Sequence, residues 1–503
     1  MSTEATIFTG VGVYLLVMLV IGIWASKRSG STENFIVAGR RMPLWIVSAT
    51  LVATWFGGGT IMGAGGAAYD DGMVGVIADP FGASMVFFVV GFFFVRIFRR
   101  LRLLTVVDFL ENRYGKTAGM IAALGLMCSN VGWTGAMLVA FGLIFQSLTG
   151  VPMEVGMFAG AIVVFVYTVA GGMWAVALTD FVQILLIAVG LIMLLVVALI
   201  DVGGWGAISR RLPEGTFSMI PAVHTWEVWL NYCRAWLIFG LADVTAQTLM
   251  QRAFAARNEQ VAQNSFYVAG FAYLSLGMIP VMLGIIAMAT MPGIVGSETV
   301  IPELAVAHLH PVAVSVFVGA LLAAIMSSAD SALLACASIF SVNVMPLFRR
   351  GPISDRARLL ATRIAIPVFG FLALYVALEV KVVYDLVQDA NILLLVSVVV
   401  PFVCGIWWKN ANRTGALASM AVGFLTLFLV FFFAPGFPGD LLGLVTSLVT
   451  MFVVGALTQK FDPPVPLRNG DGEEVEMKDR LGTLPLFRRV DQPAERLSQP
   501  GAS

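Results

Sequence analysis

Apolar segments long enough to cross a lipid bilayer recur along almost the whole of this chain. A helix rises about 1.5 Å per residue, so roughly 20 apolar residues cross the ~30 Å of hydrocarbon in a bilayer. Because backbone groups in lipid must bond within their own segment, such stretches form helices. The sequence therefore predicts an all-α polytopic membrane protein with about 13 transmembrane helices. They are expected at residues 7–25, 44–67, 72–98, 117–145, 152–170, 174–200, 226–250, 262–291, 311–345, 359–378, 382–408, 415–433 and 441–457.

The composition leaves no room for a large soluble domain. Hydrophobic residues make up 59% of the chain and charged residues 12%, which is typical of polytopic membrane proteins. We expect residues 1–457 to form one transmembrane domain, and residues 458–503, rich in Pro, Arg and Asp, to form a mostly disordered cytoplasmic tail. The 4 cysteines fall inside predicted spans, and the chain has 3 histidines and no net charge. These features argue against disulfides, a zinc site and nucleic-acid binding.

Lysine and arginine residues cluster in alternate connections between the predicted spans, with Arg210 and Arg211 as the exception. Short cytoplasmic loops hold such residues in excess. The pattern places the N-terminus outside and the C-terminus in the cytoplasm, with the protein multi-pass in the cell membrane. The first span lacks a preceding positively charged region and a cleavage motif, so we expect it to be retained. The basic connections follow the first, third, seventh, ninth and eleventh spans, at residues 27–41, 96–116, 252–257, 349–358 and 409–413.

A short polar stretch, Met326 to Ser331, lies inside the apolar run of residues 311–345 and carries its only charge, Asp330. A carboxylate at bilayer depth costs about 3 kcal/mol, so an ionisable residue there indicates a site. Serine hydroxyls and backbone carbonyls are hard oxygen ligands of the kind that sodium takes. The stretch predicts half of a cation site in a transporter, although Asp330 could equally be a structural partner for a neighbouring helix.

Glycine clusters mark places where a predicted helix can break. Three consecutive glycines, Gly57 to Gly59, lie midway along the second span. Small residues also serve close helix packing, but a triplet lowers the cost of unwinding, and irregular backbone at this depth must line a cavity or be buried. The segment Phe239 to Thr245 in the seventh span, with Asp243, is the expected counterpart. Paired broken helices near the midplane hold the sites of transporters built from inverted repeats.

Two further carboxylates fall within predicted spans, Asp180 near the start of the sixth and Asp79 inside the third. Asp180 follows a small-residue seam at Gly171 and Gly172, and could be a site residue or a helix N-cap. Asp79, next to Pro80, could complement a cationic substrate or hydrogen-bond to a neighbouring helix.

Four segments in this order resemble the sodium:solute symporter family: Thr54 to Gly59, Thr105 to Gly115, Gly171 to Gln183, and Ala324 to Ser331. The resemblance covers roughly residues 7–457. Within the family, the chain is most similar to the high-affinity choline transporter branch, which Gln251, Arg252 and Trp133 also match. The resemblance implies a LeuT-type core of two inverted five-helix repeats, at approximately 44–200 and 226–408, with one leading and two trailing helices.

The resemblance also implies ligands for sodium. Backbone oxygens of Ala53, Phe56 and Ala324 and the hydroxyls of Ser327 and Ser328 match the sodium site of such carriers. A second cation or coupling site is implied at Asp180 and Ser331, with Asp330 as a further candidate.

For the organic substrate, Trp55 and Trp133 match part of an aromatic cage in which a quaternary ammonium lies against ring faces. Cation–π contact suits a cation that cannot donate a hydrogen bond, although membrane tryptophans also serve packing and interfaces. Ala83 and Ala246 occupy positions where the branch has two further aromatic residues, so the chain departs from the cage. The remaining substrate candidates are polar: Asp79, Asp243, Gln247 and Gln388.

The expected function is sodium-coupled symport that imports a small organic solute across the bilayer, with a quaternary amine such as choline or betaine as the first candidate. Proline, another small amino acid, a carboxylate or a neutral solute is the alternative, and a sodium-linked membrane sensor is more remote. An intramembrane enzyme lacks support, because the spans carry no histidine cluster and no serine with a partnered base. Sodium is the expected coupling ion, and no cofactor and no nucleic-acid partner are expected.

Overall fold

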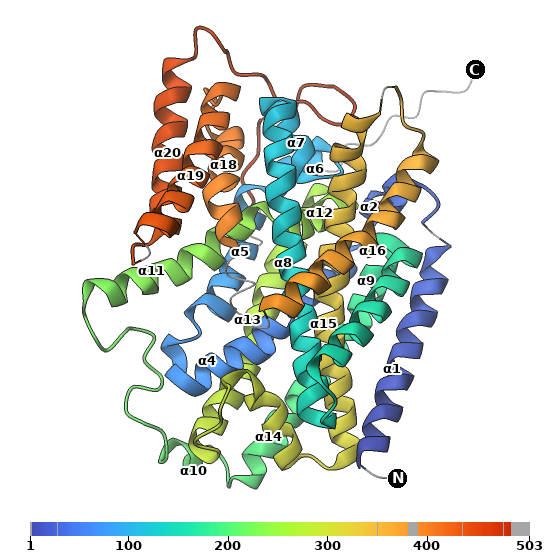
Figure 1. Ribbon diagram of the computed structural model, residues 1–503, viewed down its shortest axis with the longest axis vertical. Helices are drawn as coiled ribbons and strands as arrows, with labels where there is room; N and C mark the ends of the chain where they lie inside the picture. The colour runs from blue at the N-terminus through green and yellow to red at the C-terminus, as the bar shows by residue number, and fades with distance from the viewer. Residues whose placement is uncertain are drawn as a thin grey trace, which may run out of the picture.

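A computed structural model describes residues 3–27, 29–349, 351–380, 391–434, 436–475 and 477–483 of the chain. These residues form helices and connections, with only two isolated β-bridges among them (Figure 1). The α-helices are α1 (Thr3–Ser26), α2 (Thr32–Val37), α3 (Leu44–Trp55), α4 (Ala64–Asp71), α5 (Ala83–Phe93), α6 (Val95–Leu101), α7 (Val106–Tyr114), α8 (Lys116–Thr149), α9 (Met153–Asp201), α10 (Trp205–Ser209), α11 (Trp226–Leu241), α12 (Gln247–Ala255), α13 (Glu259–Thr290), α14 (Val300–His308), α15 (Pro311–Ile339), α16 (Asp355–Val380), α18 (Val399–Trp407), α19 (Arg413–Phe433) and α20 (Gly439–Leu457).

Among the described residues, 7 helices are long and apolar enough to cross a membrane, or up to 9 if each bent pair is one span. The helix α9 has 49 residues, which at 1.5 Å per residue gives ~74 Å, too long for one crossing. Its backbone leaves the helical region at Gly172, with φ 57° and ψ −157°. A β-carbon there would also lie 2.6 Å from the carbonyl oxygen of Phe35. Two of the expected spans, 152–170 and 174–200, therefore share α9, and the total of about 13 stays a prediction.

Two helices break where the glycine-containing segments predicted. The helix α3 ends at Trp55, and a π-helical segment, Gly59–Gly63, leads into α4 at a bend of 59°. The second break follows α11, where the 3₁₀ segment Ala242–Thr245 and an extended Ala246 separate α11 from α12. These observations confirm both predicted discontinuities.

The helix α15 lies at the centre of the bundle, and α19 and α20 lie at its edge (Figure 1). In the most apolar window of each helix, 83% of residues are buried for α15 and 22% for α19. Every residue from Phe317 to Ile339 is buried. A helix surrounded by protein on all sides must satisfy its polar groups within the protein, so the serines and Asp330 of α15 face other helices and not lipid.

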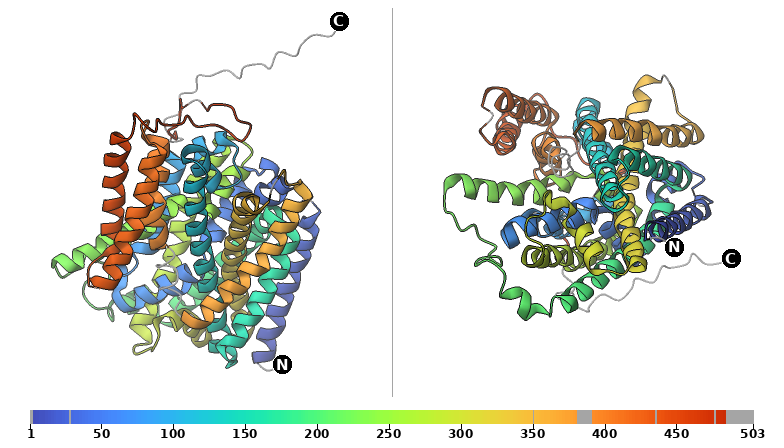
Figure 2. Two further views of the ribbon diagram at one scale, coloured as in Figure 1. Left: turned by 45° about the horizontal axis from the view of Figure 1, so that its top comes forward. Right: turned by 60° about the horizontal axis from the view of Figure 1, so that its bottom comes forward.

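The start of α1 lies at one end of the bundle, and the chain leaves α20 at the opposite end, together with α6 and α7 (Figures 1 and 2). We call this second end the inner end. The helix α11 projects sideways from the body in both figures.

The described part of the C-terminal tail lies across the inner end. The amide of Gly470 donates to the carbonyl oxygen of Leu101 at 2.8 Å, and that of Gly482 donates to Phe92 at 2.6 Å. The guanidinium of Arg480 lies 4.5 Å from the centre of the Trp407 ring. The described part of the tail up to residue 483 therefore differs from the expectation of disorder. The amino-acid composition of the tail could not indicate that helices α5, α6 and α18 provide it with binding partners.

Candidate functional site

The unwound segment after α3 lies directly against α15. The amide of Gly57 donates to the carbonyl oxygen of Trp55 at 2.9 Å, so it does not extend the helix by bonding to Ala53. A β-carbon on Gly57 would lie 2.5 Å from the hydroxyl oxygen of Ser328. Glycine therefore permits the contact between the broken helix and the polar part of α15, and it leaves the carbonyl of Ala53 without its helical donor.

The two adjacent serines of α15 are both fully buried. The hydroxyl of Ser328 donates to the carbonyl oxygen of Ala324 at 3.2 Å. The hydroxyl of Ser327 makes no hydrogen bond of normal geometry among the described residues, and the carboxylate of Asp180 lies near it. Leaving such a group unpaired costs about 1–3 kcal/mol, so each case calls for an explanation. A buried hydroxyl without a well-formed hydrogen bond, beside a broken helix, is suited to bind a small cation.

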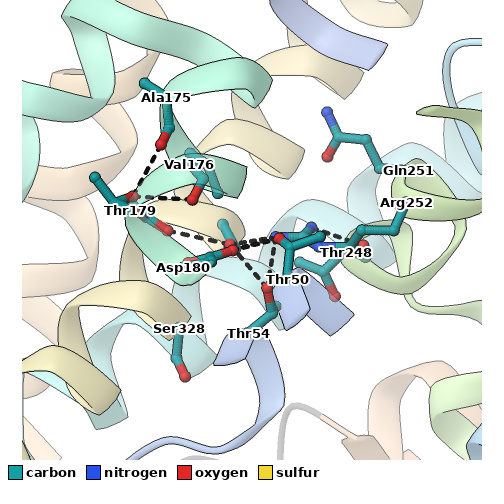
Figure 3. A network of polar contacts seen from close by, with 12 residues as sticks. Thr50, Thr54, Ala175, Val176, Thr179, Asp180, Thr248, Gln251, Arg252 and Ser328 are labelled. Atoms are coloured by element: carbon teal, nitrogen blue, oxygen red, sulfur yellow. Dashed lines mark hydrogen bonds and ion pairs between the residues drawn. The ribbon is translucent and has the colours of Figure 1, made fainter. Parts of the chain in front are cut away.

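A fully buried arginine, Arg252 of α12, joins the helices around this point (Figure 3). Its Nη2 donates to the hydroxyls of Thr54 and Ser331, each at 2.5 Å, and lies 3.7 Å from Oδ2 of Asp180. The hydroxyl of Thr50 also donates to Asp180. The cluster thus connects α3, α9, α12 and α15, and it places a fixed positive charge at the predicted second cation site.

The position of Asp180 excludes one of its two predicted roles. The residue lies inside α9, 8 positions after the break at Gly172, and its side chain is fully buried. The N-cap interpretation is therefore wrong, because the helix resumes well before Asp180. Its Oδ2 bonds to Thr50 and pairs with Arg252. Its Oδ1 makes no hydrogen bond of normal geometry among the described residues, and the hydroxyl of Ser327 lies near the same carboxylate.

Both carboxylate oxygens of Asp330 accept hydrogen bonds. The hydroxyl of Tyr167 in α9 donates to its Oδ2 at 2.7 Å and also lies 2.9 Å from the carbonyl oxygen of Met326. The hydroxyl of Ser331 donates to its Oδ1 at 3.1 Å. Asp330 therefore ties α9 to α15, as its structural interpretation expects, and it also touches the Arg252 cluster through Ser331.

A small cavity lies beside the breaks in the two discontinuous helices. It brings together both predicted tryptophans and Asp243, with a volume of about 30 Å³. Pockets that hold organic ligands usually have about 300–1,000 Å³, whereas 30 Å³ holds water. Binding an organic solute therefore requires these helices to move apart. The lining residues are Thr54, Trp55, Ser129, Asn130, Trp133, Asp243, Ala246, Thr248, Asn391 and Leu394.

Sequence reasoning missed two amides of this cavity. The side chain of Asn391 donates to Oδ2 of Asp243 at 3.2 Å, and Asn130 donates to the carbonyl oxygen of Leu126, one turn back in α8. The available signal was an amide side chain inside an otherwise apolar span. Trp55 also packs on Phe87, with ring centres 5.1 Å apart, so its packing role and its place in the cavity coexist.

The other polar candidates lie elsewhere. Asp79 accepts hydrogen bonds from Thr60 at 2.7 Å and Tyr273 at 3.0 Å, which agrees with its helix-to-helix alternative. The amide of Gln247 bonds to the backbone of the connection before α7, at Leu104 and Val106. Neither residue lines the cavity. Gln388 lies outside the described residues.

Comparison with known proteins decides the family. The model of the Sodium:solute symporter family matches residues 35–423. The chain belongs to the sodium:solute symporter family. As a member of this family the protein is a membrane transporter that couples a small solute to sodium, and not an enzyme.

Curated relatives and a solved structure agree with this membership. The chain is 29% identical to the high-affinity choline transporter 1 of Caenorhabditis elegans, over 89% of this chain and 84% of that one. It is 30% identical to the human high affinity choline transporter 1, over 82% and 74%. The structure of a Na⁺-coupled sialic acid symporter in a substrate-bound outward-open state superposes with a TM-score of 0.79 at 18% identity, covering 92% of this chain and 99% of that chain. The symporter therefore has the all-α LeuT-type fold that the sequence predicted.

Proposed function

We propose that this symporter uses the inward sodium gradient to import a small organic cation, with a quaternary amine such as choline as the first candidate. The observation that carries the proposal is the contact between the broken helix at Gly57 and the buried serine pair of α15, where the Ser327 hydroxyl makes no hydrogen bond of normal geometry among the described residues. Sodium would be held there by neutral oxygens of the broken helix and α15, namely those of Ala53, Phe56, Ala324, Ser327 and Ser328.

Neutral ligands suit a coupling ion that must bind and leave in every cycle. At a membrane potential of 100 mV each sodium charge supplies about 2.3 kcal/mol before its concentration gradient is added. Asp180, Ser331 and Asp330 form the proposed second coupling site. Its Asp180 carboxylate already pairs with Arg252, so that site differs from the serine pair in carrying a resident positive charge.

The choice of solute rests on the cavity. Trp55, Trp133 and Asp243 line it together, and two ring faces with a carboxylate suit a cation that cannot donate a hydrogen bond. The choline transporters among the relatives support the same class. Ala246, which also lines the cavity, offers no ring, and this small side chain favours the alternative of proline or another small solute without a quaternary ammonium.

Orientation and boundaries complete the proposal. We place the start of α1 outside and the inner end in the cytoplasm, on the distribution of lysine and arginine in the connections. The transmembrane domain would comprise residues 1–457, with core repeats at 44–200 and 226–408, and the tail would follow from residue 458.

The test is charge movement by the purified full chain in proteoliposomes under an inward sodium gradient. The panel contains choline, betaine, proline, a sugar, a monocarboxylate and urea. A sodium-dependent current with choline or betaine is the expected result. A current with proline alone would replace the solute class, and a current that does not depend on sodium would contradict the proposal.

Replacing Trp55 with alanine is expected to weaken choline binding selectively. A desolvated cation–π contact contributes up to about 2 kcal/mol, which corresponds to a roughly 30-fold rise in the choline concentration for half-maximal current. Competition by 3,3-dimethylbutanol, a neutral molecule of the same shape, should change far less. Trp226→Ala is the matched control, because that tryptophan is 78% exposed on α11. Equal losses for choline and its neutral analogue would show that Trp55 acts by packing alone.

A further inference from the structure

The buried side chain of Gln247 joins α12, whose neighbouring residues line the cavity, to the start of α7. Gln247 is the first residue of α12 and lies between Ala246 and Thr248, which both line the cavity. Its Oε1 accepts a hydrogen bond from the amide of Val106 at 2.7 Å, and its Nε2 donates to the carbonyl oxygen of Leu104 at 3.3 Å. First-turn amides of a helix lack partners within the helix. Gln247 therefore supplies the partner that fixes the start of α7 against α12.

The same connection is bonded to the end of α15. Thr105, the N-cap of α7, donates its hydroxyl to Oδ1 of Asn343 at 2.8 Å. Asn343 in turn donates from Nδ2 to Oδ1 of Asp108 at 2.7 Å. Asn343 belongs to the π-helical segment Phe340–Val344 that continues α15, and α15 carries the serine pair. One short connection thus contacts both α12, whose first residues adjoin the cavity, and the segment that continues α15, the helix of the serine pair.

The segment Leu103 to Asp108 comprises this connection and the first turn of α7, and it contacts both α12 and a hollow at the inner end. The hollow has a volume of about 900 Å³, and Leu103, Leu104 and Asp108 line it. Residues 469–472 of the tail line the same hollow. The 30 Å³ cavity lies on the side of Gln247, at its neighbours Ala246 and Thr248. A solute leaving the cavity along α12 toward the inner end would meet the connection before the hollow.

We propose that residues 103–108 form the inner gate of the cavity. Gln247 of α12 and Asn343 of the segment that continues α15 hold this gate shut. The inference rests on the proposed function, since it assumes that the inner end faces the cytoplasm and that solute leaves there. The gate bonds to both helices at once, so it releases when either α12 or the end of α15 changes position. A movement of α12 caused by solute and a movement of α15 caused by sodium would thereby both act on residues 103–108.

The gate is tested by thiol labelling of a cavity position from the inner side. The reporter is Ala246→Cys in the full chain with its 4 cysteines replaced by alanine, reconstituted in proteoliposomes and exposed to a membrane-impermeant maleimide on the inner face. Gln247→Leu and Asn343→Leu should each raise the labelling rate about tenfold, as expected from the loss of two hydrogen bonds that hold the closed state. Labelling measures access and not transport, so failure of the gate and failure of the proposed solute or ion remain distinguishable.

The matched control is Gln251→Leu. Gln251 is a fully buried glutamine of the same helix whose Nε2 donates to the carbonyl oxygen of Ile36 at 2.6 Å, away from the gate. It should leave the labelling rate unchanged. Equal acceleration by Gln251→Leu, or none by either gate variant in protein that elutes as wild type does, would overturn the proposal.

A second variant is designed to keep the gate closed. Its effect on uptake therefore cannot arise from a general loss of stability that opens the structure. Thr105→Cys with Asn343→Cys, oxidised to a disulfide, should hold the gate shut and reduce solute uptake to below about a tenth of its reduced level. Reduction should restore uptake. Full uptake by the cross-linked protein would contradict the gate.

Discussion

Replacing Arg252 with methionine is expected to destabilise the protein by about 3–5 kcal/mol, because breaking a buried ion pair leaves an uncompensated charge. The arginine and Asp180 are both fully buried. The variant also removes the donor that Thr54 and Ser331 share. Methionine retains much of the side-chain volume, so the loss measures charge and hydrogen bonds more than packing. The measurement is the midpoint of thermal unfolding in detergent, followed as the fraction of protein that remains monodisperse after heating.

Two further variants separate the ion pair from a general effect of removing arginine. Combining Arg252→Met with Asp180→Asn removes the stranded charge and should recover a large part of the lost stability. Arg102→Met removes an arginine whose bridge to Asp471 is exposed on both sides, and should cost at most about 1 kcal/mol. An Arg252→Met protein that unfolds at the wild-type temperature would show that Arg252 does not hold these helices together.

The positions of the helix breaks and the burial of the serine pair within the protein could be predicted because their sequence signals are local. A glycine triplet lowers the cost of unwinding wherever it stands, and hydroxyls beside a carboxylate in an apolar helix need polar surroundings within the protein. The arginine cluster could not be predicted in the same way. Its partners Thr54 and Ser331 lie 198 and 79 residues from Arg252, so only the packing of helices shows that one guanidinium reaches both.

Gln247 shows how the register of a short helix decides a role. A polar residue next to the break of a cavity helix is a reasonable substrate candidate, and its neighbours Ala246 and Thr248 do line the cavity. A helix turns about 100° per residue, so adjacent residues point in different directions. The amide of Gln247 therefore reaches Leu104 and Val106, and nothing in the sequence alone indicated that direction.

Removing both hydroxyls of the serine pair, in Ser327→Ala with Ser328→Ala, is expected to abolish the dependence of transport on sodium. Oxygen contacts to a charged group contribute about 1.5–3 kcal/mol each, so losing two should raise the sodium concentration for half-maximal current at least ~100-fold. The measurement is solute-driven current as a function of sodium concentration in proteoliposomes. Ser338→Ala is the matched control, since Ser338 is a buried serine of the same helix that donates to the carbonyl oxygen of Leu334 at 2.6 Å. Unchanged sodium activation in the double variant would remove the serine pair from the sodium site.

The single variant Ser327→Ala separates a ligand from a structural hydroxyl by the sign of its effect on stability. Since this hydroxyl makes no hydrogen bond of normal geometry among the described residues, the fold loses little when it is removed, and the unfolding temperature without sodium should stay level or rise. The affinity for sodium should fall in the same protein. A hydroxyl that served the fold would lower both quantities together. A steady or higher unfolding temperature together with a lower affinity for sodium is expected only for a hydroxyl that binds the ion reversibly.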